Sequence, residues 1–192
     1  MKKRRIIKSI FASMLAIIMV LSLTSIVSAA DPKATLTINN TVAGKTVDLY
    51  QVFSAIKNGT SVSYTLNTQY KPFFTSAANN KYGCSGKEGQ TLSDAAYNYV
   101  ANLSDNGKVD FAKEILKWSL DSANKVGKYN DIEIETAEPS TSVSVQDYGF
   151  YLVYLKGASD ITTSITGVTE YSPAILVNVT KTNVGINMKS SY

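Results

Sequence analysis

The segment Val145–Lys156 reads VQDYGFYLVYLK and is the most strand-like run of the sequence. Alternation along a strand would give it two faces, one formed by Phe150, Leu152 and Tyr154 and the other by Tyr151, Val153 and Leu155. Both faces are apolar or aromatic. The pattern therefore predicts a central strand that is covered on both sides.

The first thirty residues are expected to be removed rather than folded. Met1–Lys8 is basic, Ile10–Val27 is an uncharged apolar run, and small residues around Ala29 and Ala30 offer a cleavage site. This arrangement is typical of a secretory signal peptide, cleaved after either alanine. A retained membrane anchor is the alternative, because the apolar run is nearly long enough to span a bilayer. The polar turn Asp31-Pro32 favours cleavage.

The charge of the chain changes when the predicted signal peptide is set aside. The whole sequence has 19 Lys+Arg and 15 Asp+Glu, or +4. The signal peptide holds five of the basic residues and no acidic ones, so residues 31–192 carry 14 against 15, or −1. They contain no arginine, the preferred residue for bidentate phosphate recognition. We therefore expect no nucleic-acid partner, and membrane contact only through the signal peptide before cleavage.

Missing residue types exclude several kinds of active site. Histidine is absent, which excludes Ser-His-Asp and Cys-His nucleophilic sites and most zinc sites. Cys84 is the single cysteine, so no intrachain disulfide can form. It is expected to be a free thiol, with intermolecular pairing as the alternative. We expect neither enzymatic activity, nor a cofactor, nor a bound metal.

The order of predicted elements is strands, then two helices, then strands. Strands are expected at Ala34–Ile38, Lys45–Ile56, Val62–Leu66, Asp131–Glu135, Gly149–Leu155, Thr162–Ile165, Pro173–Thr180 and Asn183–Met188. The first two should form a hairpin. One helix should begin near Ser93 or Asp94 and be broken by Asp105-Asn106-Gly107. A second, Phe111–Lys125, should be capped by Asp110, with Phe111, Ile115 and Trp118 in its buried stripe.

This order predicts a mainly β fold, an Ig-like antiparallel β-sandwich with a two-helix insertion at about residues 91–126. Residues 31–192 should form a single domain. In the second strand, Val47, Leu49 and Phe53 should share one face, with Tyr50 and Val52 on the other.

Four segments together resemble the amino-terminal domain of Gram-positive sortase-assembled, isopeptide-forming pilin subunits. They are GKTVDLYQVFSAI at Gly44–Ile56, KEILKWSL at Lys113–Leu120, YGFYLVYLKG at Tyr148–Gly157 and SPAILVNVTKTNVGINMK at Ser172–Lys189. The resemblance implies an Ig-like domain of a covalent, head-to-tail fibre on the cell wall. It also implies that the protein is secreted. The implied partners are other pilin subunits and a sortase.

The resemblance further implies a lysine that accepts the carboxyl end of another subunit. Lys189 fits best because it follows the last predicted strand, and Lys181 in a predicted turn is second. Met188 stands where many family members have proline, and no Leu-Pro-x-Thr-Gly motif is present. We therefore expect the sequence to be the amino-terminal part of a longer subunit, able to accept a sortase linkage but not to donate one.

Many domains of this family carry an internal isopeptide bond, in which a neutral lysine amine attacks a carboxamide beside a protonated acid. The bond motif does not align here, so several candidates stay open. They are the lysines Lys33 and Lys45, the amides Asn178 and Asn187, and the acids Asp48, Glu133 and Glu135.

Two other functions fit parts of the sequence. The segment Tyr70–Gln90 could present aromatic residues to a host surface ligand, as an adhesin would, but packing against the helical insertion is the favoured interpretation. The aromatic residues concerned are Tyr70, Phe73, Phe74 and Tyr82. Glu133 and Glu135 could serve a glycosidase, but their spacing equally fits the solvent face of an edge strand.

The internal cross-link gives a mass prediction. A Lys–Asn isopeptide bond releases ammonia, so the exported protein should weigh about 17 Da less than its sequence, and a branched peptide should join Lys33 or Lys45 to Asn178 or Asn187. Intact-mass spectrometry with peptide mapping of residues 31–192 measures both. An unmodified mass would remove the cross-link.

Overall fold

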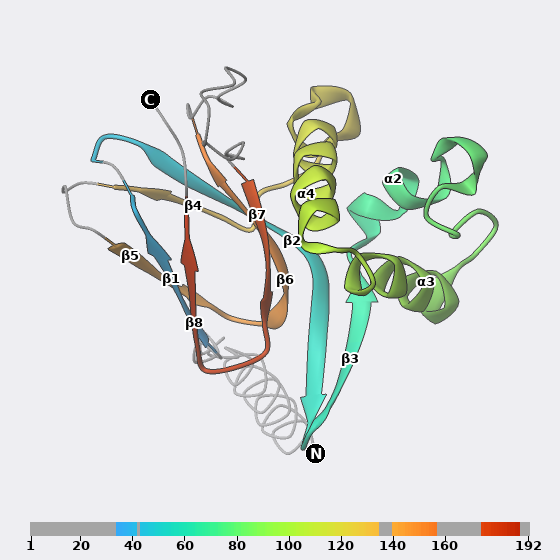
Figure 1. Cartoon of the computed structure of the whole chain (residues 1–192), viewed down its shortest axis with the longest axis horizontal. Coiled ribbons are helices and arrows are strands. Elements are labelled where there is room, and N and C mark those ends of the chain that lie inside the picture. The colour runs from blue at the N-terminus through green and yellow to red at the C-terminus, as the bar shows by residue number, and fades with distance from the viewer. Residues whose placement is uncertain (1–33, 42, 135–139, 157–173, 189–192) are drawn as a thin grey trace, which may run out of the picture. The chain divides into compact units, whose positions relative to one another are not determined.

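The computed structural model describes residues 34–41, 43–134, 140–156 and 174–188 (Figure 1). The predicted signal peptide and the predicted strand Thr162–Ile165 lie outside these residues. No helix among the described residues is long and apolar enough to cross a membrane.

Strand β6 (Tyr148–Leu155) is central, as its sequence predicts. It pairs antiparallel with β2 (Thr46–Asn58) on one side and with β7 (Ala174–Val179) on the other. Tyr151, Val153 and Leu155 are fully buried in one core. Leu152 is fully buried in a second core, where Phe150 and Tyr154 are partly buried. The prediction of two covered faces is confirmed.

Two sheets make up the β part of the structure. The larger sheet has the order β3-β2-β6-β7, and β4 also pairs with β2; β3 is Ser61–Leu66 and β4 is Asn130–Glu133. The smaller sheet has the order β5-β1-β8, formed by Ser140–Val145, Ala34–Asn39 and Asn183–Asn187. The mainly β, two-sheet fold is confirmed, although β5 was not predicted.

The two sheets face each other across what we call the sandwich core. Its buried residues include Leu36 and Ile38 from β1, Val143 and Val145 from β5, and Val47, Leu49, Tyr151, Val153 and Leu155 from the larger sheet. The predicted hairpin of the first two strands is wrong, because β1 and β2 lie in different sheets. Both strands have apolar faces that must be buried, and facing each other across the core buries both.

The predicted faces of β2 need one correction. A β-bulge shifts the pairing of β2 with β6 between Gln51 and Phe53. Phe53 therefore lies with Tyr50 and Val52 in the second core, not with Val47 in the sandwich core. An extra residue in one strand reverses the alternation beyond it, which a strict period of two cannot anticipate.

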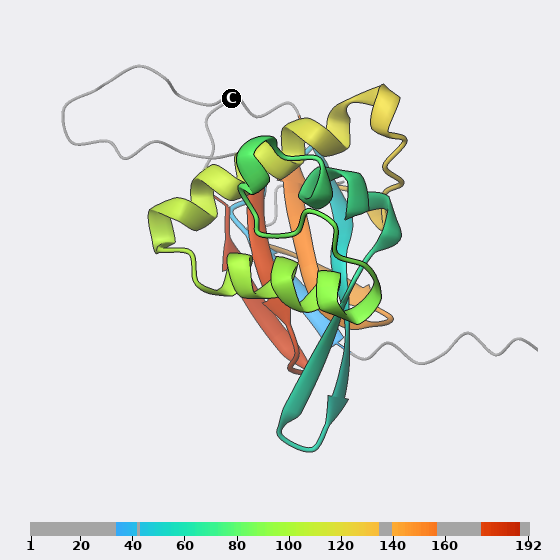
Figure 2. The same ribbon diagram turned by 90° about the vertical axis from the view of Figure 1, so that its right-hand side faces the viewer.

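Helices cover the other face of the larger sheet (Figures 1 and 2). The main ones are α3 (Gly89–Ala101) and α4 (Asp105–Leu120). Short elements precede and follow them: η1 (Thr68–Tyr70), α2 (Lys71–Thr75), η2 (Ala78–Asn80) and η3 (Ser122–Asn124). The helical segment thus begins well before the predicted residue 91.

The predicted helix starts are also wrong. Helix α3 begins at Gly89, before Ser93 and Asp94. Helix α4 begins at Asp105 rather than after Asp110, because the Ser104 side chain accepts a hydrogen bond from the backbone N–H of Gly107 at 3.2 Å. This cap satisfies a donor of the first turn, so Asp105-Asn106-Gly107 opens the helix instead of breaking it.

The second core, which we call the helical core, joins these helices to β2, β3 and β6. Its aromatic centre contains Phe53, Tyr70, Phe73, Phe74, Tyr82 and Phe111. The rings of Phe73 and Phe74 meet edge to face, with centroids 5.2 Å apart. Ile115 of α4 is fully buried here, and Trp118 packs against the cluster, as the predicted stripe of α4 requires.

Gly149 provides a test of the contact between β2 and β6. A Cβ atom at Gly149 would lie 2.0 Å from the carbonyl oxygen of Phe53, beside the bulge. Gly149→Ala should therefore lower the free energy of unfolding by about 3 kcal/mol, because backbone must move. Urea denaturation measures this. Gly185→Ala in β8, where nothing lies within 4 Å of the new atom, is the matched control and should be nearly neutral. Equal stabilities of the two variants would contradict the close approach.

Candidate functional site

The first and last described strands are parallel neighbours. Pairing runs from Thr35 opposite Asn183 to Asn39 opposite Asn187. The chain therefore enters the sandwich at Ala34 and leaves it at Met188, at opposite ends of the same ladder (Figure 1). We call these the entry end and the exit end.

Hydrogen bonds fasten both ends of this ladder. At the entry end, the N–H of Thr35 donates to the carbonyl of Thr182 at 2.7 Å. At the exit end, the N–H of Met188 donates to the carbonyl of Asn39 at 3.1 Å, and the side chain of Asn39 donates to that of Asn187 at 2.9 Å. Strand β1 is therefore hydrogen-bonded to the chain at both ends of β8, at the entry end and at the exit end.

The two candidate acceptor lysines belong to opposite ends. Lys181 is exposed in the turn between β7 and β8, at the entry end. Lys189 lies outside the described residues, and its neighbour in sequence, Met188, is buried at the exit end. Which lysine is used would therefore set which end of the domain carries the joint.

The candidates for an internal cross-link are spread over the fold. Lys33 and Glu135 lie outside the described residues. Lys45 precedes β2 at the exit end, where its carbonyl accepts from the N–H of Ile134, and Glu133 is exposed on β4.

Both candidate amides hydrogen-bond to residues other than lysine. The Asn178 side chain exchanges hydrogen bonds with the Tyr64 hydroxyl at 2.9 and 3.2 Å, on the helical side of the larger sheet. That of Asn187 accepts from Asn39. No structural observation tests the cross-link, which stays a prediction.

Asp48 has a lysine partner that the sequence did not reveal. Its side chain is buried, and the Lys128 ammonium donates to its Oδ1 at 2.8 Å, with Asp131 Oδ2 at 3.8 Å from the same ammonium. The hydrogen bond to Asp48 raises the pKa of Lys128 above its ordinary value. The pair therefore acts as an electrostatic tie between Lys128 and strand β2.

The aromatic residues of the segment Tyr70–Gln90 do not form an exposed patch. Tyr70, Phe73, Phe74 and Tyr82 are all buried in the helical core, as the favoured interpretation predicts. Cys84 is also fully buried and free, with its thiol donating to the carbonyl of Tyr82 at 3.3 Å. Burial raises the pKa of this thiol, and pairing with another molecule would require the loop to open.

Comparison with known proteins adds a distant structural likeness. No family model matches the sequence, and no curated protein matches it. Among solved structures, the chain is similar to the T6 backbone pilin of serotype M6 Streptococcus pyogenes, described as a modular three-domain structure with variable loops and extensions. The match has 16% sequence identity and a TM-score of 0.42. It covers 85% of this chain and 29% of the pilin chain, so this chain spans less than a third of that protein.

The Asp48–Lys128 pair predicts a stability effect that depends on pH. Lys128→Met should lower the free energy of unfolding at pH 7 by about 1 kcal/mol, because it leaves Asp48 buried without its cation; the cost is modest because the Lys128 side chain is 38% exposed. Since the folded-state pKa of Lys128 is raised, the stabilisation is complete below about pH 10.4 and is lost as the pH rises through the raised value. Urea denaturation at pH 7 and pH 11 measures both effects.

The gap in stability between the native protein and Lys128→Met should therefore narrow at pH 11. Lys117→Met, which changes an exposed lysine on α4, is the control and should cost little at either pH. A gap that is absent at pH 7, or that widens at pH 11, would contradict the tie.

Proposed function

We propose that this chain is a structural domain of a sortase-assembled pilus, exported to the cell surface and joined covalently to other subunits. One observation carries the proposal: the parallel pairing of β1 and β8 places chain entry and chain exit at opposite ends of one sandwich. A domain of a head-to-tail fibre must attach to its neighbours at opposite ends, and Lys181 at the entry end and the outgoing chain at Met188 offer two such points. The order of the four pilin-like sequence segments supports it.

The same pairing suits a fibre under tension. With the joint at Lys181, a pull on that lysine and an opposite pull on Met188 would slide β8 along β1, so that all the hydrogen bonds of this ladder bear the load together. Were the chain to enter and leave at one end, the strands would be peeled apart one bond at a time. The sandwich core behind β1, which includes Leu36 and Ile38, resists the same displacement.

The proposed joint is an amide between a lysine side chain of this chain and the carboxyl end of another subunit. Lys189 follows the exit end directly, where a linkage would continue the line of β8. Lys181 is the second candidate, and its use would place the joint at the entry end of the domain instead of the exit end. A contribution to adhesion is proposed as well, but it cannot act through the aromatic residues of the segment Tyr70–Gln90, which are buried.

Covalent assembly can be tested in the cells that make the protein. Cell-wall extracts boiled in SDS should show a ladder of high-mass species when blotted for this chain, since amide-linked subunits do not dissociate. Lys189→Arg should abolish the ladder, because a guanidinium keeps the charge but does not accept an acyl group. Lys117→Arg, on an exposed face of α4, is the matched control and should leave the ladder unchanged.

The outcome for the second lysine decides the polarity of the fibre. Loss of the ladder in Lys181→Arg but not in Lys189→Arg would move the joint to the entry end. A protein that runs only as a monomer in the native extract would overturn the proposal.

A further inference from the structure

Two shallow hollows flank α3. This helix lies across the outside of the helical layer (Figure 2). The first, of about 650 Å³, lies between α3 and the loop at residues 80–83, and Asn80, Tyr99 and Asn102 help to line it. The second, of about 340 Å³, lies between α3 and β3, and Ser63, Asp94 and Tyr97 help to line it. Asn98 lines both, and we call the two hollows together the α3 groove.

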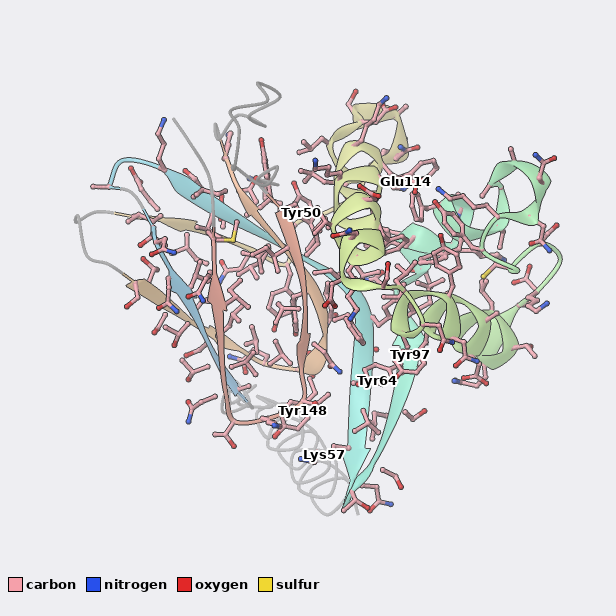
Figure 3. The ribbon with its side chains drawn as sticks, in the orientation of Figure 1. Tyr50, Lys57, Tyr64, Tyr97, Glu114 and Tyr148 are labelled. Carbon is pink, nitrogen blue, oxygen red and sulfur yellow. The ribbon has the colours of Figure 1, made fainter. Side chains whose placement is uncertain are left out.

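A rigid tyrosine stands on each side of Asn98. The ring of Tyr97 stacks on that of Tyr64, with centroids 4.3 Å apart and planes at 12°; Figure 3 shows these two side chains beside each other. The ring of Tyr99 meets that of the buried Tyr82 edge to face at 4.9 Å. Each outer ring is half-buried and held by an inner one. Such rings lose little conformational entropy when a ligand covers them.

The polar groups between the rings are mostly neutral carboxamides. The side chain of Asn98 is exposed. The exposed Asn102 side chain donates from its Nδ2 to the Asn98 carbonyl at 2.8 Å, and its own oxygen can still accept a hydrogen bond. On the other side, Asp94 accepts from the side chain of Gln90 at 2.7 Å.

The charge of the groove is nearly balanced. Lys81, which also lines the first hollow, is neutralised by Glu114 at 2.6 Å. Asp94 adds one negative charge to the second hollow. A phosphate or carboxylate ligand would need a free cation here, whereas the cation that lines the groove is paired and a carboxylate lies nearby.

We propose that this groove binds a neutral oligosaccharide. A pyranose ring presents an apolar C–H face, which packs on tyrosine, and hydroxyl groups, each of which donates and accepts hydrogen bonds. Carboxamides also donate and accept, so Asn98 and Asn102 match hydroxyl groups better than a purely anionic or cationic lining would. The site is independent of covalent assembly, since a single unlinked molecule carries all of it.

Titration of the ¹⁵N-labelled protein with maltotriose, N,N′,N″-triacetylchitotriose and lacto-N-tetraose, followed by NMR, tests the proposal. At least one of these neutral sugars should shift the backbone amide signals of residues 94–102 in a saturable way. Asn98→Ala should weaken that binding about fivefold, the loss expected for one hydrogen bond. Asn106→Ala, which changes an exposed asparagine on α4 outside the groove, should bind as the native protein does.

Two results would overturn the proposal. One is that none of the three sugars shifts the α3 signals. The other is that Asn98→Ala binds as tightly as the native protein. Because this titration uses the unlinked protein and the ladder assay uses cell-wall extracts, failure of one leaves the other standing.

Discussion

Burial of both faces of β6 is the constraint on which the rest of the structure depends. A strand with Tyr151, Val153 and Leu155 on one face and Leu152 on the other has no face left for water, so it requires two cores at once. The small sheet β5-β1-β8 supplies one cover and the helices supply the other. The helical segment is therefore a structural layer of the domain rather than an attachment to it, and its aromatic residues serve to fill that layer.

The bulge in β2 lets a neighbouring strand satisfy the same constraint. Before the bulge, Val47 and Leu49 face the sandwich core and Tyr50 faces the helices; Val52, the extra residue of the bulge, is buried in the helical core too. The extra residue turns Phe53 to the helical side too, where its ring packs 6.0 Å from that of Phe74. It also brings the Phe53 carbonyl over β6, which is tolerated because the residue beneath it is a glycine. As a result, both aromatic residues of β2, Tyr50 and Phe53, pack in the helical core.

The sequence predicted correctly those elements whose hydrophobic pattern is formed by residues close together in the chain. Alternation placed β6 and β7, and the 3.6-residue period placed the buried stripe of α4. Pairing between distant segments was not predicted, because it is set by the tertiary fold: β1 pairs with β5 and β8 instead of β2, and Lys128 reaches Asp48 across 80 residues of sequence. The groove on α3 also escaped prediction. Tyr97 and Tyr99 are two among many tyrosines, and only the structure shows that each rests on an inner ring.

The two proposed roles use separate parts of one domain. A load between a joint at Lys181 and the outgoing chain at Met188 would pass through β8 and its partner β1, in the small sheet. The groove on α3 lies in the helical layer, on the other side of the larger sheet (Figure 1). Between them stand β2 and β6, whose two buried faces bind the layers together. Tension would therefore be carried by one sheet while the outer face of α3 keeps its shape, because the rings that define the groove rest on Tyr64 and Tyr82 rather than on β1 or β8. Such a division would let a fibre subunit hold a sugar while it is pulled.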